Sequence, residues 1–288
     1  MTVTRYLITG AAGMLGRDLQ ELLADEAVTA LSRRELDVAD AAAVAAAVVG
    51  HDVIVNAAAY TKVDDAESHE EDALRVNALG AENLAVAAAS AGAVLVQVST
   101  DYVFDGSATT PYAEDAPLAP VSAYGRTKAE GERRALAAHP EGTLIVRTAW
   151  LYGRHGPNFA ATMLRLAAER ETLTVVDDQR GQPTWTGDLA AQIVALVETG
   201  ARSGAFHGTA SGETSWFGFA RAIFEEAGLD PQRVQPTDSS SFARPAPRPA
   251  YSVLGHDAWS GVGLAPLRDW REGLSAAWAA GAIVGPGA

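Results

Sequence analysis

The stretch from Tyr6 to Gly16, YLITGAAGMLG, decides the fold of this chain. Its first part, Tyr6–Thr9, is a short apolar run typical of a buried β-strand, and leucines with helical spacing follow its last glycine. Glycines between a strand and a helix let the backbone approach a pyrophosphate, which then lies at the helix N-terminus. We therefore predict a dinucleotide-binding turn built on Gly10, Gly13 and Gly16. The alternative is the same strand–turn–helix without a ligand.

Downstream of this turn, apolar strands alternate with helices. The predicted strands are Val28–Leu31, Val53–Asn56, Val94–Ser99 and Leu144–Thr148, and the predicted helices are Asp40–Val49, Leu79–Ala91 and Ser122–Ala138. Strands that are apolar throughout and separated by helices indicate a parallel sheet covered on both faces. The expected fold is an α/β, doubly wound (Rossmann) sheet with a smaller mixed substrate-binding lobe.

The alternation loosens after about residue 150. Helices are expected at Asn158–Glu169, Leu189–Thr199 and Trp216–Ala227 and near Leu267–Trp278, with a strand at Leu173–Val176. We assign residues 1–150 and parts of 173–205 to the NAD(P)-binding domain, and 151–288 mainly to the substrate-binding lobe. The proline-rich loop 236–249 has the length of a binding loop.

Composition excludes several classes of function. The chain has 288 residues and a net charge of −14, so its overall field repels nucleic acid and anionic lipid. It has no cysteine, which excludes disulfides and thiolate chemistry. The six histidines are scattered, so no metal-ligand cluster is predicted. No apolar stretch is long enough to span a bilayer, and the expected location is the cytoplasm.

The end of the second strand bears on the choice of coenzyme. Ser32, Arg33 and Arg34 follow Leu31, where an NAD-preferring fold would place an acidic residue against the ribose 2′-hydroxyl. An arginine there would pair with a 2′-phosphate, which favours NADPH and leaves NADH as the alternative. Asp37 follows closely and is expected near the adenine.

Tyr124 and Lys128 form the main catalytic candidate. Four residues apart on one helix, they share a face, so the ammonium can lie near the phenol and lower its pKa. With only two lysines in the chain, Lys62 and Lys128, this spacing is not expected by chance. Thr100 ends a parallel strand, where it would hydrogen-bond a carbonyl oxygen while Tyr124 protonates it.

Longer motifs identify a family. The chain resembles an extended, or atypical, short-chain dehydrogenase/reductase, and more narrowly the dTDP-4-dehydrorhamnose reductase family. The segments that carry this resemblance are GAAGMLG (10–16), NAAAYTKVDDAE (56–67), VNALGAENLA (76–85), VSTDYVFDG (98–106), YGRTKAEGE (124–132), RTAWLYG (147–153), GQPTWTGDLA (181–190) and RPAYSVLG (248–255). They cover nearly the whole chain.

The resemblance implies roles for individual residues. The cofactor would contact Gly13, Met14, Leu15, Ser32, Asp37, Val38, Ala59, Tyr60 and Thr61, and Tyr124 and Lys128 at the nicotinamide ribose. Tyr124 would be the general acid, Thr100 and Asp101 would lie against the substrate sugar, and Trp150 would form part of its pocket. A subset of the family is described as using Mg²⁺ at a dimer interface, so both Mg²⁺ and a homodimer stay open here.

Other candidates come from the residues themselves. Arg244 and Arg248 in the proline-rich loop are candidates for holding a diphosphate, because an acidic protein needs local cations for an anionic nucleotide sugar. For Trp150, the alternative to a place in the substrate pocket is packing in the apolar core. Asn77 is expected to cap a helix, and the acidic run 64–72 is expected to be a solvated helix face.

Together with these residues, the resemblance implies NAD(P)H-dependent reduction of the C4 ketone of a nucleotide-linked 4-keto-6-deoxyhexose, with dTDP-4-dehydro-L-rhamnose favoured as substrate. Alternatives are a reductase of another dTDP-4-keto-deoxysugar in a secondary-metabolite pathway and a catalytically silent regulatory or binding subunit. An epimerase or dehydratase of the same superfamily is a third option, and of these the dehydratase is disfavoured, because Tyr102 rather than an acidic residue follows Thr100-Asp101.

Overall fold

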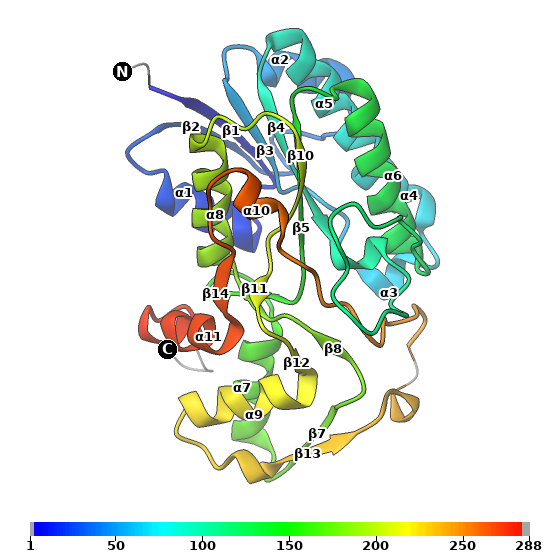
Figure 1. The fold of residues 1–288 in the computed structure, drawn as a ribbon, viewed down its shortest axis with the longest axis vertical. Helices are drawn as coiled ribbons and strands as arrows, with labels where there is room; N and C mark the ends of the chain where they lie inside the picture. Colours follow the sequence, from blue (N-terminus) through cyan, green and yellow to red (C-terminus); the bar gives the residue numbers. More distant parts are fainter. Residues whose placement is uncertain (1–2, 243, 284–288) are drawn as a thin grey trace.

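The computed structural model describes residues 3–242 and 244–283, and a six-stranded parallel sheet forms its centre (Figure 1). In the order β10-β5-β4-β3-β1-β2, the strands are Gly204–His207, Thr143–Thr148, Val94–Thr100, Val53–Asn56, Arg5–Thr9 and Ala27–Leu31. Every adjacent pair is parallel. The chain leaves β1 first toward β2 and then crosses to β3, so the carboxyl ends of β1 and β3 flank a crevice. The doubly wound α/β fold is confirmed.

Helices cover both faces of this sheet. On one face lie α1 (Met14–Leu22), α8 (Thr186–Glu198) and α10 (Ala258–Gly261), which pack against a core that includes Ile8, Leu19 and Trp259. On the other lie α2 (Ala41–Val48), α5 (Gly80–Ala91) and α6 (Ala123–Ala138), with Leu7 and Leu84 in their core. Burial on both faces explains why the central strands are mostly apolar, although β4 and β5 also bury Gln97 and Arg147.

Side chains at the helix ends fix these boundaries. Asp40 caps α2 by accepting from the amides of Ala42 and Ala43. Ser122 caps α6, and Gly92 ends α5 in a left-handed conformation. Two boundaries differ from expectation. Helix α8 begins earlier, at Thr186, and residues 267–269 form a short strand before the last helix.

The segment between β3 and α5 is nearly continuous helix. It consists of α3 (Val63–Ala66), α4 (Glu70–Leu74) and a π-helical turn, η1 (Arg75–Leu79), that runs directly into α5. Asn77 lies buried inside this turn, so its predicted role as a cap at a helix start is wrong. The backbone amides around it are already paired within the helix, and its side chain bonds elsewhere.

The second half builds a smaller lobe, which Figure 1 shows below the sheet. Its helices are α7 (Phe159–Glu169), α9 (Trp216–Glu226) and α11 (Trp270–Ala279), around a separate apolar core. Its two-stranded sheets pair β7 (Leu173–Val176) with β13 (Val234–Thr237), β8 (Arg180–Gly181) with β12 (Thr214–Ser215), β11 (Ala210–Ser211) with β14 (Leu267–Asp269), and β6 (Leu151–Tyr152) with β9 (Thr184–Trp185). Short 3₁₀ turns are η2 (Asp101–Val103), η3 (Pro231–Arg233) and η4 (Ser239–Ser241).

The lobe is mixed, because the β8–β12 pair is antiparallel and the others are parallel. Strand β10 and helix α8 join the large sheet, whereas β7 pairs with β13 in the lobe. The residue boundaries of the two domains stay a prediction, and residues 284–288 of the assigned lobe lie outside the described residues. None of the helices described combines the length and apolarity needed to cross a membrane.

Candidate active site

A cavity of about 860 Å³ opens at the carboxyl ends of the central strands. Its lining begins at the glycine turn, passes the ends of β3, β4 and β5, and reaches α6 and the first residue of α9. A crevice at this edge, where the strand order reverses, is the usual ligand site of an open α/β sheet. The cavity therefore contains both the predicted cofactor turn and the predicted catalytic residues.

The glycine turn needs glycine for steric reasons. Gly10 has φ +69°, and a Cβ on it would lie 2.6 Å from the backbone of Ala57. A Cβ on Gly16 would lie 2.6 Å from the carbonyl oxygen of Gly10. Gly13 precedes α1, so the amides of the first helical turn have no partner within the helix, and Met14 and Leu15 of this turn line the cavity. Such a helix N-terminus suits a diphosphate.

Only some of the candidate cofactor-binding residues that follow β2 line the cavity. Arg33, Asp37 and Val38 line the cavity, whereas Ser32 does not. The amide and hydroxyl of Ser32 donate to Glu35 Oε2 at 2.8 and 2.7 Å, which holds the pKa of Glu35 below its usual range. A carboxylate thus lies beside Ser32, contributed by a residue three positions later that sequence reasoning missed. Ala59, Tyr60 and Thr61 line the cavity as expected.

Tyr124 and Lys128 both project from α6 into the cavity, together with Thr100 at the end of β4. The predicted lowering of the Tyr124 pKa is wrong for this structure. Burial raises the pKa of Tyr124 to about 12, against the opposing effect of a hydrogen bond with Thr100. Lys128 is itself buried, its Nζ donates to the carbonyl of Val98 at 2.6 Å, and burial lowers its pKa to about 8. Desolvation is thus the largest cause of both pKa shifts.

Asp101 is a buried acid next to Thr100. It is 3% exposed and lines the cavity, and burial raises its pKa to about 6, against the lowering effects of the neighbouring hydroxyl groups of Ser252 and Thr100. The structure thus places Asp101 in the cavity wall together with Thr100.

Asn77 joins two walls of the cavity, which sequence reasoning missed. Its Oδ1 accepts from the amide of Tyr60 at 2.8 Å, and its Nδ2 donates to Thr127 Oγ1 at 3.0 Å. Tyr60 follows β3 and lines the cavity, and Thr127 lies between Tyr124 and Lys128 on α6. Asn77 therefore ties the segment after β3 to helix α6. A π-helical turn at a functional site is a recurrent feature that the sequence pattern does not reveal.

Trp150 follows β5 and lines the cavity, with its indole stacked on that of Trp216. It is half-buried, so neither pure core packing nor full exposure describes it. Trp216 also lines the cavity and was missed, because its contribution depends on how the lobe folds back onto the sheet.

Arg248 lies beside the cavity rather than in its lining. Its Nη2 is 2.9 Å from Asp64 Oδ1, and its guanidinium lies over the ring of Tyr102, 5.9 Å from the centroid. Arg244 also approaches Asp64, at 3.7 Å. The acidic run thus contributes a partner for the proline-rich loop in addition to a solvated face.

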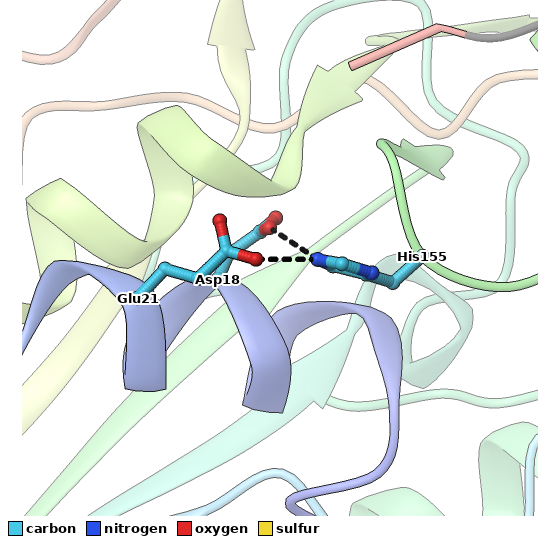
Figure 2. Close-up of side chains that lie close together, drawn as sticks. All are labelled: Asp18, Glu21 and His155. Carbon is cyan, nitrogen blue, oxygen red and sulfur yellow. Dashed lines mark hydrogen bonds and ion pairs between the residues drawn. The ribbon is translucent and has the colours of Figure 1, made fainter. Parts of the chain in front are cut away.

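His155 forms a cluster with two acids of α1, shown in Figure 2. Its Nε2 lies 2.9 Å from Glu21 Oε1 and 3.8 Å from Asp18 Oδ1. His155 is far from Asp18 and Glu21 in the sequence, so its proximity to them was not predicted. The donor set does not fit Mg²⁺, which prefers oxygen ligands, and the contacts already account for the arrangement as a tether between α1 and the cavity-lining loop 155–157.

Comparisons with known proteins agree over nearly the full length. The family described as "RmlD substrate binding domain" matches residues 4–282. A "dTDP-4-keto-6-deoxy-D-glucose reductase" of Streptomyces niveus is 53% identical, with 95% of this chain and 96% of the relative aligned. A "dTDP-4-dehydrorhamnose reductase" of Mycobacterium tuberculosis is 48% identical over 96% and 93% of the two chains. A crystal structure of a Bacillus anthracis dTDP-4-dehydrorhamnose reductase in complex with NADP superposes with a TM-score of 0.93, at 40% identity, covering 97% of this chain and 100% of that one.

Proposed function

The chain belongs to the dTDP-4-dehydrorhamnose reductase family of extended short-chain dehydrogenases/reductases, and from this we propose that it reduces the C4 ketone of a dTDP-linked 4-keto-6-deoxyhexose. The family resemblance inferred from the sequence is confirmed. The observation that carries the proposal is the convergence of Thr100, Tyr124 and Lys128 in one cavity that begins at the glycine turn.

NADPH is the proposed cofactor, and when bound it supplies a hydride to the carbonyl carbon. Support comes from the B. anthracis relative, whose structure holds NADP, and from Arg33 at the cavity edge. We propose the cofactor contacts at Gly10, Gly13, Met14, Leu15, Gly16, Ser32, Arg33, Asp37, Val38, Ala59, Tyr60, Thr61, Tyr124 and Lys128. Ser32 has the weakest support of these, because Glu35 already occupies its amide and hydroxyl.

The proton chemistry belongs to Tyr124. Its pKa of about 12 keeps the phenol protonated at neutral pH, so it can donate to the alkoxide that develops on the sugar. Thr100 hydrogen-bonds the same oxygen and polarises the carbonyl. Lys128 contributes positive charge that stabilises the phenolate left after the transfer.

Substrate contacts are proposed at Thr100, Asp101, Trp150 and Arg248. The first three line the cavity, and Arg248 stands next to Tyr102 at its edge. A bidentate guanidinium is suited to a diphosphate, and the net charge of −14 makes such a local cation necessary. We propose a cytoplasmic enzyme without nucleic-acid or membrane partners, and leave a homodimer as one option.

A second candidate is reduction of a different dTDP-4-keto sugar. It is favoured by the S. niveus relative, named for dTDP-4-keto-6-deoxy-D-glucose, which has a higher identity than the M. tuberculosis protein. The two substrates differ in ring stereochemistry, so the stereochemistry of the product separates the candidates.

The decisive experiment measures NADPH oxidation with a panel of dTDP-4-keto-6-deoxy sugars, followed by NMR of the products. We expect turnover with at least one substrate and a single C4 epimer. Tyr124→Phe serves as the matched inactive control. Absence of turnover with every member, combined with intact NADPH binding, would instead favour a catalytically silent subunit.

A further inference from the structure

Trp150 has an unusual backbone conformation. Its φ is +48°, and within residues 3–242 and 244–283 it is the only residue other than glycine with a positive φ. This left-handed region is unfavourable for a bulky side chain and persists only where the surroundings hold it in place. The question is therefore which residues hold Trp150.

Two residues of the lobe do so. The indole of Trp216 stacks on that of Trp150 with ring centroids 3.6 Å apart and an interplanar angle of 8°. Gly181 leaves room for the indole, because a Cβ there would lie 2.5 Å from its Cε2. Trp150 itself follows β5 of the large sheet, whereas Gly181 and Trp216 belong to β8 and α9 of the lobe. The position of its side chain therefore depends on elements in the other half of the chain.

Trp216 is itself held firmly. It is the first residue of α9, whose N-cap Ser215 accepts from the amide of Gly218 at 3.0 Å and donates to Asp177. Phe159 of α7 packs against its ring, with centroids 4.6 Å apart. A continuous set of aromatic contacts thus connects the cavity wall to the core of the lobe.

We propose that Trp216 is a positioning and specificity-determining residue, which fixes Trp150 as an apolar wall for the C5 methyl group of a 6-deoxyhexose. The inference rests on the proposed function and extends it to a residue outside the predicted site. Trp216 acts mainly through Trp150, and both indoles line the cavity that holds Thr100 and Tyr124.

The chemistry of the substrate favours this wall. In a 4-keto-6-deoxyhexose the ring carbon next to the carbonyl bears a methyl group, so an apolar group must lie close to the reacting centre. A methyl group against an indole gains contact and loses no hydrogen bonds. The hydroxyl of a hydroxymethyl group in the same place would give up its hydrogen bonds with water and find no new partner. An apolar pocket nevertheless rejects an added hydroxyl only moderately, by up to about 100-fold.

The test uses full-length protein saturated with NADP⁺ and two probes that differ only at C6, dTDP-6-deoxy-D-glucose and dTDP-D-glucose. Isothermal titration measures the affinity for both in wild type, Trp216→Ala and Trp216→Leu. Phe217→Ala is the matched control, since Phe217 neighbours Trp216 on α9 and does not line the cavity. Far-ultraviolet circular dichroism reports the stacked indoles independently, as an exciton couplet.

We expect wild type and Phe217→Ala to prefer the 6-deoxy sugar and to show the couplet. Trp216→Ala should lose the couplet, weaken binding of the 6-deoxy sugar by about tenfold and bring the ratio of the two affinities toward one. The NADPH affinity should stay within about twofold of wild type, because the cofactor turn is distant in the chain and independently built. Trp216→Leu, which keeps apolar bulk for folding, should lose the couplet and most of the discrimination.

Unchanged affinity ratios in both variants of an active wild-type enzyme would overturn the inference alone. So would loss of the couplet without any effect on sugar binding. If wild type reduces no dTDP-4-keto sugar and binds neither probe, the proposed function fails first and this inference fails with it.

Discussion

The hydroxyl of Thr100 donates a 2.9 Å hydrogen bond to Oδ1 of its neighbour Asp101, while Oδ2 of that carboxyl group is buried without a partner among the described residues. A buried oxygen atom that lines a cavity and lacks a partner is costly to the folded protein. The site therefore contains a group whose arrangement suits ligand binding rather than stability.

This relationship predicts a gain of stability in Asp101→Asn. Burial raises the pKa of Asp101 to about 6 from 3.8, so the folded protein binds the proton more tightly than the unfolded chain. The resulting penalty is fully present above about pH 6 and disappears as the pH falls below about 4. At pH 7.5, the free energy of unfolding of the variant should be about 1–3 kcal/mol higher than that of wild type. Its kcat/KM for the sugar should be lower than that of wild type.

Urea unfolding at pH 7.5 and pH 4 checks this prediction. Asp105→Asn is the control, because hydrogen bonds with Tyr112 and Ser107 lower the pKa of exposed Asp105 to about 2, the opposite direction. It should not gain stability at pH 7.5. A stabilisation of Asp101→Asn that is equal at both pH values would contradict a buried charge as its cause.

Tyr124→Phe removes the proton donor and keeps the ring. We expect kcat to fall by about 10²–10⁴, with the Kd for NADPH nearly unchanged. Steady-state kinetics and fluorescence titration measure the two quantities. Tyr102→Phe is the matched control, since Tyr102 packs edge-on against Tyr124 at 5.6 Å and also lines the cavity. Near-normal turnover of Tyr124→Phe would remove Tyr124 from its proposed role.

The pH profile should report Lys128. Burial lowers its pKa to about 8, with Glu132 acting in the opposite direction. The ammonium is present below this pH and is lost above it, so kcat/KM should decline as the pH rises through about 8. Rates measured from pH 6 to 10 check the direction. A rate that stays constant up to pH 10 would show that the charge of Lys128 is not needed, or that it does not titrate there.

Much of the fold could be predicted because its signals are local. Each central strand is an apolar run, and Asp40 and Ser122 stand directly before the helices they cap. The spacing of Tyr124 and Lys128 places both on one face of one helix without any knowledge of tertiary structure. These features depend on residues close together in the sequence.

The remaining features depend on how distant segments meet. Trp216 reaches Trp150 only after the lobe folds onto the sheet, and His155 approaches Asp18 only through the loop after β6. The shifts of the Tyr124 and Lys128 pKa values follow from burial, which spacing on a helix does not reveal. The error about Tyr124 arose because charge proximity was counted and desolvation was not.

Arg33 and Arg34 provide a matched pair for testing coenzyme choice. Both are exposed at the end of β2, but only Arg33 lines the cavity. If Arg33 pairs with the 2′-phosphate, Arg33→Ala should reduce the preference for NADPH over NADH by about 1–3 kcal/mol, whereas Arg34→Ala should change it little. The ratio of kcat/KM for the two coenzymes measures this preference. Equal effects of the two variants would indicate a general charge effect instead.

The ion pair of Arg248 with Asp64 leads to the last prediction. Asp64 Oδ1 lies 2.9 Å from Arg248 Nη2 and is also 3.3 Å from the amide of Ala246, so Asp64 anchors the proline-rich loop beside the cavity. Nη1 of the same guanidinium is buried without a partner among the described residues. Because a guanidinium can bind two acceptors in its plane, Arg248 can keep Asp64 and still donate to a phosphate oxygen.

If Arg248 contacts the diphosphate, Arg248→Ala should weaken binding of the nucleotide sugar by about 1.5–3 kcal/mol and leave the Kd for NADPH nearly unchanged. Arg244→Ala should have a smaller effect on sugar binding, because the side chain of Arg244 is 60% exposed and its contact with Asp64 is long, at 3.7 Å.

Asp64→Asn tests whether Asp64 acts by anchoring the loop or by its charge. It keeps a hydrogen-bond acceptor for the loop but removes a negative charge near the substrate phosphates, so sugar affinity should hold or improve. Isothermal titration of both ligands decides the matter. Weakened NADPH binding in Arg248→Ala would place the arginine at the cofactor, and a loss of sugar affinity in Asp64→Asn as large as in Arg248→Ala would show that both residues only hold the loop in place.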